Sequence, residues 1–104
     1  MGQNFINDGR SITLTSGILA DEPVSGSAPL SMVNGGLNSF VAAAAEELPR
    51  GIRINVVCPT IVEDSAQAYG RIFAGFDPVP MKRVVNGYVK SVEGGATGRI
   101  IRVY

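Results

Sequence analysis

The sequence predicts an α/β fold in which three parallel strands alternate with two helices, in the order β-α-β-α-β. The first observation is an Ala-rich stretch of helical periodicity, residues 31–48, that runs through a Pro- and Gly-containing turn into a β-branched run at 51–60. That run is short, apolar and bounded by Pro and Gly, which is typical of a strand buried on both faces. The second observation is a further helical pattern followed by a last β-rich segment. Strands joined through a helix pair in parallel.

The first predicted elements lie before the Ala-rich helix. Residues 1–8 resemble the tail of something longer, and Asn-Asp-Gly at 7–9 indicates a turn or a helix end. Residues 11–15 alternate in polarity and are rich in β-formers, which predicts a strand that ends at Ser16. The stretch 19–29 is rich in Pro, Gly and Ser and predicts a loop.

The Ala-rich helix has a predicted start and a predicted buried face. We expect Ser31 to be its N-cap, because a serine hydroxyl can accept a hydrogen bond from a free backbone N–H of the first turn. Apolar residues close to helical spacing indicate the face that packs on the sheet. These residues are Val33, Leu37, Phe40, Val41, Ala44 and Leu48.

Three segments follow the central strand. Residues 63–73 predict a short helix, of the kind that either covers a site or simply connects two elements. Residues 79–92 predict a second long helix, and the Gly-rich turn 94–98 leads to a last strand at 99–103. The side chains expected on the buried side of the second long helix are Val84, Val85, Tyr88 and Val92.

Length and composition limit what the chain can be. With 104 residues, 45% hydrophobic and 17% charged, it is expected to fold as at most one domain, residues 1–104. No apolar run reaches the roughly 18 to 20 residues that span a bilayer, and the first residues do not form a secretory signal, so we expect a cytoplasmic protein and no membrane partner. The net charge is zero without a Lys/Arg cluster, which indicates no nucleic-acid partner.

The absence of histidine excludes Ser-His-Asp and Cys-His nucleophile arrangements and metal sites built on histidine. The single cysteine, Cys58, has no partner for an internal disulfide or a zinc site, and we expect it to be a small buried hydrophobe. No metal site is predicted. Any chemistry must therefore use Tyr, Lys, carboxylates or a cofactor.

The passage at 47–59 resembles a known family. Its sequence, E-L-P-R-G-I-R-I-N-V-V-C-P, is similar to the late helix-to-strand passage of the short-chain dehydrogenase/reductase family, E-L-x-x-x-G-I-R-V-N-x-V-x-P-G. The family's Pro-Gly is Pro59-Thr60 here, and Asp64-Ser65 replaces a Thr expected a few residues later. The alternative is any α/β protein in which a buried strand follows a helix.

The resemblance implies a partial Rossmann-like fold, with the three predicted strands matching the last three of the family's seven. The chain would then be the C-terminal half of an NAD(P)-binding domain. The Gly-rich turn that holds the pyrophosphate at a helix N-terminus would belong to the other half, and neither spacing of that turn occurs before a helix in this sequence. We therefore expect the chain alone not to bind a nicotinamide dinucleotide appreciably.

The family's catalytic string departs from its pattern here. Y-S-A-S-K-G-G-L aligns without gaps on residues 30–37, so that Leu30 replaces the Tyr and Asn34 replaces the Lys. In the family the ammonium group lies one helical turn from the phenol and lowers its pKa. The family's Ser lies thirteen residues before the Tyr, which is Gly17 here, and Ser16 is one residue short. Ser16 is therefore a weak catalytic candidate that cannot act alone as the acid.

Other residues can be considered as substitutes. Tyr69 and Tyr88 are candidates by type and Lys82 and Lys90 by charge, but none of them forms a Tyr-Lys pair with the four-residue spacing. The alternative is that the tyrosines pack and the lysines are solvated. Glu63 and Asp64 follow the central strand, where they are either site residues or exposed loop carboxylates.

The cofactor implied by the resemblance is NAD or NADP. Asn34 could hydrogen-bond a ribose hydroxyl in place of the family's Lys, though without charge. The backbone beyond the central strand would face the nicotinamide, which makes Pro59, Thr60, Ile61 and Val62 the other cofactor-binding candidates.

Two functions remain open at this point. The first is an NAD(P)-dependent oxidoreductase acting on a small carbonyl or alcohol substrate in its complete form, of which this chain is a truncated or degenerate version. The alternative is a catalytically inactive, family-derived protein-interaction module. A homo-oligomer is expected in either case, through the unpaired edge of strand 11–15 or, as the resemblance implies, through segments 31–48 and 99–103.

Overall fold

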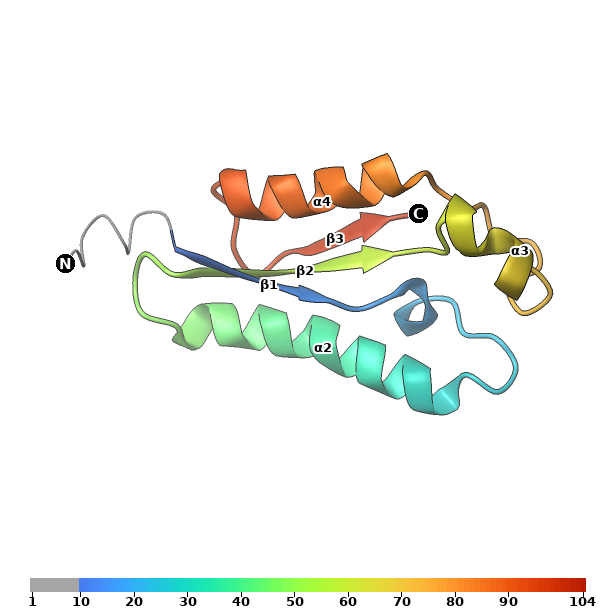
Figure 1. Cartoon of the computed structure of the whole chain (residues 1–104). Coiled ribbons are helices and arrows are strands. Elements are labelled where there is room, and N and C mark those ends of the chain that lie inside the picture. Colours follow the sequence, from blue (N-terminus) through green and yellow to red (C-terminus); the bar gives the residue numbers. More distant parts are fainter. Residues whose placement is uncertain (1–9) are drawn as a thin grey trace.

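The computed structural model describes residues 10–104 of the chain. Predictions that fall on residues 1–9, including the turn at 7–9, lie outside the described residues. A three-stranded parallel sheet has the spatial order β1-β2-β3, with one long helix on each face (Figure 1). The predicted α/β fold and its β-α-β-α-β order are therefore confirmed. The strands are β1 (Ser11–Thr15), β2 (Arg53–Pro59) and β3 (Ile100–Val103).

The central strand β2 divides the core into two layers. Its side chains alternate between the two faces of the sheet, so that Val56 packs with Val41 of the helix on one face, and Val57 packs with Val84 and Val103 on the other. Every residue from 54 to 58 is buried, as the sequence predicts for a strand covered on both sides. The helices that cover the two faces are α2 (Ala28–Glu47) and α4 (Met81–Glu93).

Helix α2 begins three residues earlier than predicted. Ser27 occupies the N-cap position, and the Ser31 N–H already donates the intrahelical bond to the Ser27 carbonyl at 2.7 Å. The prediction that Ser31 caps the helix is wrong, because Pro29 does not delay the start. A proline in the first turn lacks only an N–H that has no intrahelical partner, and its fixed φ suits the helix.

The buried face of α2 is narrower than predicted. Val41 is buried, and Leu37, Ala44 and Leu48 are half-buried, whereas Val33 and Phe40 are more than half exposed. Their predicted burial is wrong because the sheet beneath the helix is only three strands wide. Residues on one flank of α2 therefore extend past the area that the sheet covers.

Helix α4 approaches the sheet through a glycine. A Cβ at Gly87 would lie 3.2 Å from methyl groups of Val57 and Val103, so the helix backbone sits close to both strands. The buried face is consequently centred on Val84, Gly87 and Ser91. Val84 and the half-buried Tyr88 agree with the prediction. Val85 and Val92 were also predicted to be buried, and this prediction is wrong, since both are exposed.

The segments between these elements are short. The predicted helix at 63–73 is a 3₁₀ turn, Glu63–Ser65, followed by the single helical turn α3 (Ala66–Tyr69). The loop before β3 ends at Gly98, whose φ of 73° favours glycine. A Cβ added at this position would also lie only 3.0 Å from the Cβ of Ala45. Among residues 10–104, no helix has the length and apolarity needed to cross a membrane.

Candidate functional site at the carboxyl edge of the sheet

The carboxyl ends of the three parallel strands meet at one edge of the sheet. Ser16, Thr60 and Tyr104 follow the three strands directly, and α3 lies beyond this edge (Figure 1). Ligands of open α/β sheets bind in this position. All the candidate catalytic and cofactor-binding residues lie on the elements that border it.

Gly17, Asn34 and Pro59 are neighbours at this edge. A Cβ built on Gly17 would lie 3.2 Å from Asn34 Nδ2 and 3.9 Å from the Pro59 carbonyl oxygen. The fold thus brings together the positions that align with the family's Ser, its Lys and its Pro-Gly turn. The Asn34 amide occupies the space beside Gly17 that a serine side chain would enter.

Leu30 lies one helical turn before Asn34 and forms part of a pocket of about 380 Å³. This volume is within the usual range for small-molecule sites. No charged side chain contributes to the lining, and the hydroxyl groups come from serine and from Tyr69. The lining residues are Leu19, Val24, Ser25, Gly26, Ser27, Leu30, Tyr69, Ile72 and Phe73.

The backbone beyond β2 is largely paired within the chain. The Thr60 N–H donates to the Val103 carbonyl at 2.9 Å, the Ile61 carbonyl accepts from the Val79 N–H at 3.0 Å, and Val62 forms a β-bridge with Val79. Thr60 is buried, and its hydroxyl Oγ1 has no hydrogen-bond partner among the described residues. A buried hydroxyl without a partner is unusual, so a ligand that reached it would satisfy its hydrogen bonding.

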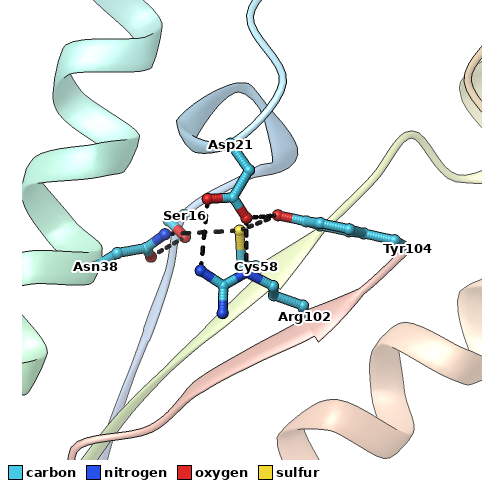
Figure 2. A network of polar contacts seen from close by, with 6 residues as sticks. All are labelled: Ser16, Asp21, Asn38, Cys58, Arg102 and Tyr104. Atoms are coloured by element: carbon cyan, nitrogen blue, oxygen red, sulfur yellow. Dashed lines mark hydrogen bonds and ion pairs between the residues drawn. The ribbon is translucent and has the colours of Figure 1, made fainter.

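Ser16 belongs to a polar network that crosses the edge (Figure 2). Its Oγ donates to Asn38 Oδ1 at 2.6 Å, and Asn38 Nδ2 donates to Cys58 Sγ at 3.8 Å. Cys58 Sγ lies 3.3 Å from the Tyr104 hydroxyl, which donates to Asp21 Oδ2 at 2.5 Å. The network joins β1, α2, β2 and the residue after β3.

The proton positions in this network follow from the number of donors. Tyr104 has one hydroxyl proton and gives it to Asp21, so the Cys58 thiol must donate to Tyr104. The sulfur then accepts from the Asn38 NH₂ group, which leaves Asn38 Oδ1 to accept from Ser16. The hydroxyl proton of Ser16 is therefore directed into the network, and only its oxygen lone pairs are free for a ligand.

The outer end of the network is an ion pair. Arg102 Nε donates to Asp21 Oδ2 at 2.6 Å. Hydrogen bonds from Arg102 and then from Tyr104 lower the pKa of Asp21. Burial and the hydrogen bond to Asp21 raise the pKa of Tyr104, so this phenol keeps its proton more firmly than usual. This direction is opposite to the one that the family's catalytic Tyr requires.

The candidate substitute residues are separated by the fold. Tyr69 lines the same pocket as Leu30, whereas Tyr88 lies on α4 and its hydroxyl hydrogen-bonds Thr15 Oγ1. Glu63 and Asp64 are exposed in the 3₁₀ turn, and Lys82 and Lys90 are exposed on α4. In the part of the chain that the structure describes, no group of three His, Cys, Asp or Glu residues could hold a metal ion.

The described residues fit only one end of a nicotinamide dinucleotide. The Asn34 amide and the unpartnered Thr60 hydroxyl are polar groups suited to the nicotinamide and its ribose. Within residues 10–104, neither spacing of the Gly-rich strand-to-helix turn is present to hold a pyrophosphate. When such a cofactor is bound, it supplies the hydride chemistry that the side chains cannot.

The network beyond Ser16 was not predicted from the sequence. Cys58 is buried as predicted, but it also links Asn38 to Tyr104. One sequence signal was available, because Asn38 follows Asn34 by one helical turn and so lies on the same face of α2. The contacts of Asp21 and Tyr104 depend on a loop conformation that no local pattern indicates.

Solved structures resemble this chain closely in fold. The protein lin1944 from Listeria innocua shares 43% sequence identity with it at a TM-score of 0.90, and the match covers 93% of this chain and 48% of that one. A short-chain dehydrogenase/reductase from Brucella melitensis, described as a glucose/ribitol dehydrogenase, matches at 20% identity and a TM-score of 0.71 over 92% and 42% of the two chains. A small-chain dehydrogenase solved in complex with NADPH matches at 23% identity and a TM-score of 0.78 over 98% and 52%.

No protein-family profile matches the sequence, and a comparison with curated proteins gives no match. The chain spans about half the length of the structures that it resembles. Its fold is that of part of a short-chain dehydrogenase/reductase, as the sequence resemblance implies.

Proposed function

From this partial short-chain dehydrogenase/reductase fold, we propose that the chain forms the substrate-side half of an NAD(P)-dependent oxidoreductase. The complete enzyme would interconvert a small carbonyl compound and its alcohol once a dinucleotide-binding half is present. The observation that supports this most strongly is the pocket of about 380 Å³, which lies one helical turn from Asn34 at the carboxyl edge. The Asn34 amide and the Thr60 hydroxyl, which lie at the same edge of the sheet, would contact the nicotinamide end of the cofactor.

The pocket lining suggests the class of substrate. The walls are mainly Leu, Val, Ile and Phe side chains with a few hydroxyl groups and without a charge. An uncharged, largely hydrocarbon ketone or aldehyde would bury its chain there, and burial is worth about 25 cal/mol per Å² of apolar area. A carboxylate substrate would lose its hydration without gaining a cationic partner.

The chain's own residues would bind and orient the substrate better than they protonate it. Leu30 has no proton to give, and the Ser16 proton is held by Asn38. Tyr69 is the remaining phenol in the pocket lining. Because positioned acid catalysis is worth about 10² to 10⁴ in rate, turnover is expected to be slow.

One side of the molecule would receive the dinucleotide-binding half. On α4, Val85 and Val92 lie three residues before and four residues after Tyr88, which hydrogen-bonds Thr15 of β1. This flank of α4 therefore overhangs β1. We name as the β1 side the free edge of β1 with its flanking exposed residues, Ile12 of β1, Val33 and Phe40 of α2, and Val85, Val89 and Val92 of α4.

A second candidate function uses the same side without catalysis. The replacement of the catalytic pair by Leu30 and Asn34, together with the apolar β1 side, supports an inactive interaction module. In this case the β1 side would bind another protein or a second copy of the chain, because a free strand edge with apolar neighbours is a template for pairing.

Substrate binding can be tested on the chain itself. The ¹⁵N-labelled chain can be titrated with 2-octanone and monitored by two-dimensional NMR. We expect the amide resonances of Leu30, Tyr69 and Ile72 to shift at 2-octanone concentrations in the millimolar range or below. Leu30→Asp should abolish these shifts, whereas Met32→Asp, on the same helix but outside the pocket lining, should preserve them. Absence of any shift in the wild-type chain would remove the substrate site from the proposal.

Catalysis needs a complete molecule. A chimera in which this chain replaces the matching half of the small-chain dehydrogenase solved in complex with NADPH should oxidise NADPH slowly with uncharged ketones and aldehydes. A chimera that binds the cofactor and the ketone but turns neither over would support the interaction module instead.

A further inference from the structure

A small hollow lies at the carboxyl edge of the sheet, apart from the proposed substrate pocket. Its volume is about 120 Å³, and no residue lines both cavities. Two carboxylate residues, one threonine and two aromatic residues contribute to its lining, and these are Glu22, Asp77, Thr60, Phe76 and Tyr104. We call it the Thr60 hollow. At roughly 30 Å³ for each water molecule, it has room for a ligand group of about four non-hydrogen atoms.

The Thr60 side chain lies on the face of the sheet that carries this hollow. Side chains alternate along a strand, and Cys58 of β2 lies on the α2 face, where it contacts Asn38. Thr60 continues the same alternation, because its N–H still pairs with the Val103 carbonyl at 2.9 Å. Tyr104 lies on this face too, since its hydroxyl is 3.3 Å from Cys58 Sγ (Figure 2).

The Thr60 hydroxyl is the polar group within the chain that lacks a partner here. Thr60 is only 6% exposed, and its Oγ1 has no hydrogen-bond partner among the described residues. A buried oxygen of this kind carries an unfavourable desolvation cost, which a ligand with an N–H donor would remove. The Thr60 hollow is the cavity that this residue lines.

The two carboxylates reach the hollow from separate segments. Glu22 follows the 3₁₀ helix η1 (Ile18–Ala20), and Asp77 follows the segment that contains α3. The hollow has no Lys or Arg in its lining. In residues 10–104, the salt bridge between Asp21 and Arg102 is the only one, so Glu22 and Asp77 have no cationic partner there. The charge at the hollow is therefore negative and uncompensated.

The aromatic part of the lining is held in place by a neighbouring ring. The Phe76 N–H donates to the Phe73 carbonyl at 3.0 Å, and Gly75 between them has a φ of 87°, which suits the third residue of a type II turn. The rings of Phe73 and Phe76 meet edge to face, with 5.3 Å between their centroids. The Phe76 ring is therefore fixed where it borders the hollow.

We propose that the Thr60 hollow binds a guanidinium group. Guanidinium is a planar cation of four non-hydrogen atoms, its N–H donors match carboxylates, and it stacks on aromatic rings. Glu22 and Asp77 would balance its charge, and the Thr60 hydroxyl would accept one of its N–H groups. The Phe76 ring would contact its face. A metal ion suits the site less well, because no group of three His, Cys, Asp or Glu residues that could hold one occurs in the described part of the chain.

This inference does not rest on the oxidoreductase proposal. An N–H donor uses a lone pair of Thr60 Oγ1, which leaves the hydroxyl proton free for the nicotinamide end of a cofactor. The guanidinium group could belong to a free small molecule or to an arginine side chain. Both sources present the same chemistry to the hollow.

The first test compares two small ligands of nearly the same shape. The ¹⁵N-labelled 104-residue chain is titrated at constant ionic strength with methylguanidinium chloride or with methylurea, which is uncharged. We expect methylguanidinium to shift the amide resonances of Glu22, Thr60 and Asp77 with a dissociation constant in the millimolar range, and methylurea to bind at least about tenfold more weakly. Equal binding of the two ligands, or no saturable shift with methylguanidinium in that range, would overturn the proposal.

Charge variants locate the site. Glu22→Gln with Asp77→Asn removes both carboxylates and should weaken methylguanidinium binding by about tenfold or more. The matched control, Glu63→Gln with Asp64→Asn, makes the same change of net charge in an exposed turn outside the lining and should leave binding within about twofold. A comparable loss in both double variants would assign the effect to net charge and contradict the site.

Thr60→Val tests the hydroxyl group separately from the charges. Valine is close to threonine in shape and removes an oxygen that has no partner, so this variant should fold at least as stably as the wild-type chain. Methylguanidinium binding should weaken by about threefold or more. Unchanged binding would show that Thr60 does not contact the ligand and would overturn the proposal.

Short peptides distinguish the two sources of the group. A blocked Gly-Arg-Gly peptide that binds at least as tightly as methylguanidinium would identify an arginine side chain as the ligand, whereas weaker binding of the peptide would identify a free small molecule. A blocked Gly-Lys-Gly peptide carries the same charge without the planar fork and should bind more weakly than Gly-Arg-Gly. Equal binding of the two peptides would contradict the choice of guanidinium.

Discussion

The edges of β1 and β3 are both free among the described residues, and α2 and α4 cover the two faces of the sheet between them (Figure 1). The side chains that these two helices place beside the two edges differ. The exposed Val33 and Phe40 lie on the flank of α2 opposite Gly35 and Ala42, which line the hollow beside β3, and therefore face β1, as Val85 of α4 does. Toward β3, α2 presents Gly35, Ser39 and Ala42, and α4 presents Arg83 and Lys90. The apolar edge suits permanent burial against another folded unit. The basic edge can remain in water.

The largest expected effect concerns the completed molecule on the β1 side. In the chimera with the small-chain dehydrogenase solved in complex with NADPH, Leu30→Tyr with Asn34→Lys should raise the rate of carbonyl reduction by about 10² to 10⁴. Leu30→Tyr alone should do little, because without a nearby ammonium the phenol keeps a pKa of about 10. The measurement is NADPH and NADH oxidation by the parent, both single variants and the double variant. A parent as fast as the double variant would mean that other residues perform catalysis.

Self-association is expected to depend on the β1 side. Phe40→Asp places a charge in the apolar patch and should weaken association of the chain by roughly 2 kcal/mol, which is about 30-fold in the dissociation constant. Ser39→Asp, on the opposite flank of the same helix, should leave it unchanged. Light scattering across the micromolar range distinguishes them. A wild-type chain that is monomeric throughout that range would contradict self-association.

Gly87 fixes which flank of α4 faces which edge. Gly87→Leu would force side-chain atoms into Val57 and Val103, where a Cβ alone already approaches to 3.2 Å. We expect a loss of about 1 to 3 kcal/mol in the free energy of unfolding, measured by urea denaturation. Asn86→Leu adds the same side chain one position away on the exposed surface and should change stability by less than about 0.5 kcal/mol. Equal effects would mean that α4 can shift on the sheet.

The smallest effect that we expect is on the pH dependence of folding stability, through the ion pair of Asp21 and Arg102. The pKa of Asp21 is lowered in the folded chain by Arg102 and Tyr104, so its stabilising contribution is present above the unfolded value near 3.8 and is lost as the pH falls through the lower, folded value. Because the pair is well exposed, the contribution should be about 1 kcal/mol or less.

Unfolding measured between about pH 5 and pH 2 should therefore be less pH-dependent in Asp21→Asn than in the wild-type chain. The exposed carboxylate Glu22, changed to Gln, serves as the matched control and should leave the wild-type slope in place. Identical slopes in the wild-type chain and Asp21→Asn would show that the ion pair contributes nothing in solution.

The order of the elements and the buried centre of the sheet could be predicted from local sequence patterns. The β-branched run around Val56 and Val57 is apolar at successive positions, and only a strand covered on both faces buries such a run. Gly98 was recognisable as part of a turn before the last strand. These features are local, because side-chain branching and the short range of turn geometry decide them.

The candidate site could be predicted only in part. Leu30 and Asn34 were identifiable by their alignment with a known string, and the structure places Asn34 beside Gly17. The network from Ser16 to Tyr104 joins residues up to 83 positions apart, which no local pattern encodes. Hydrogen bonds of this kind depend on which strand ends become neighbours, and the tertiary fold sets that.

Which apolar helix residues are buried depends on how the helices pack on the sheet. Helical periodicity predicts that Val33 is buried together with Val41, and Val85 together with Val84, because each pair lies within one apolar sector of its helix. The width of the sheet then determines how much of that sector is covered, and three strands cover only its centre. The close approach at Gly87 sets the rotation of α4 in the same way. The uncovered residues therefore became the β1 side, through the dimensions of the sheet and not through any property of their own sequence.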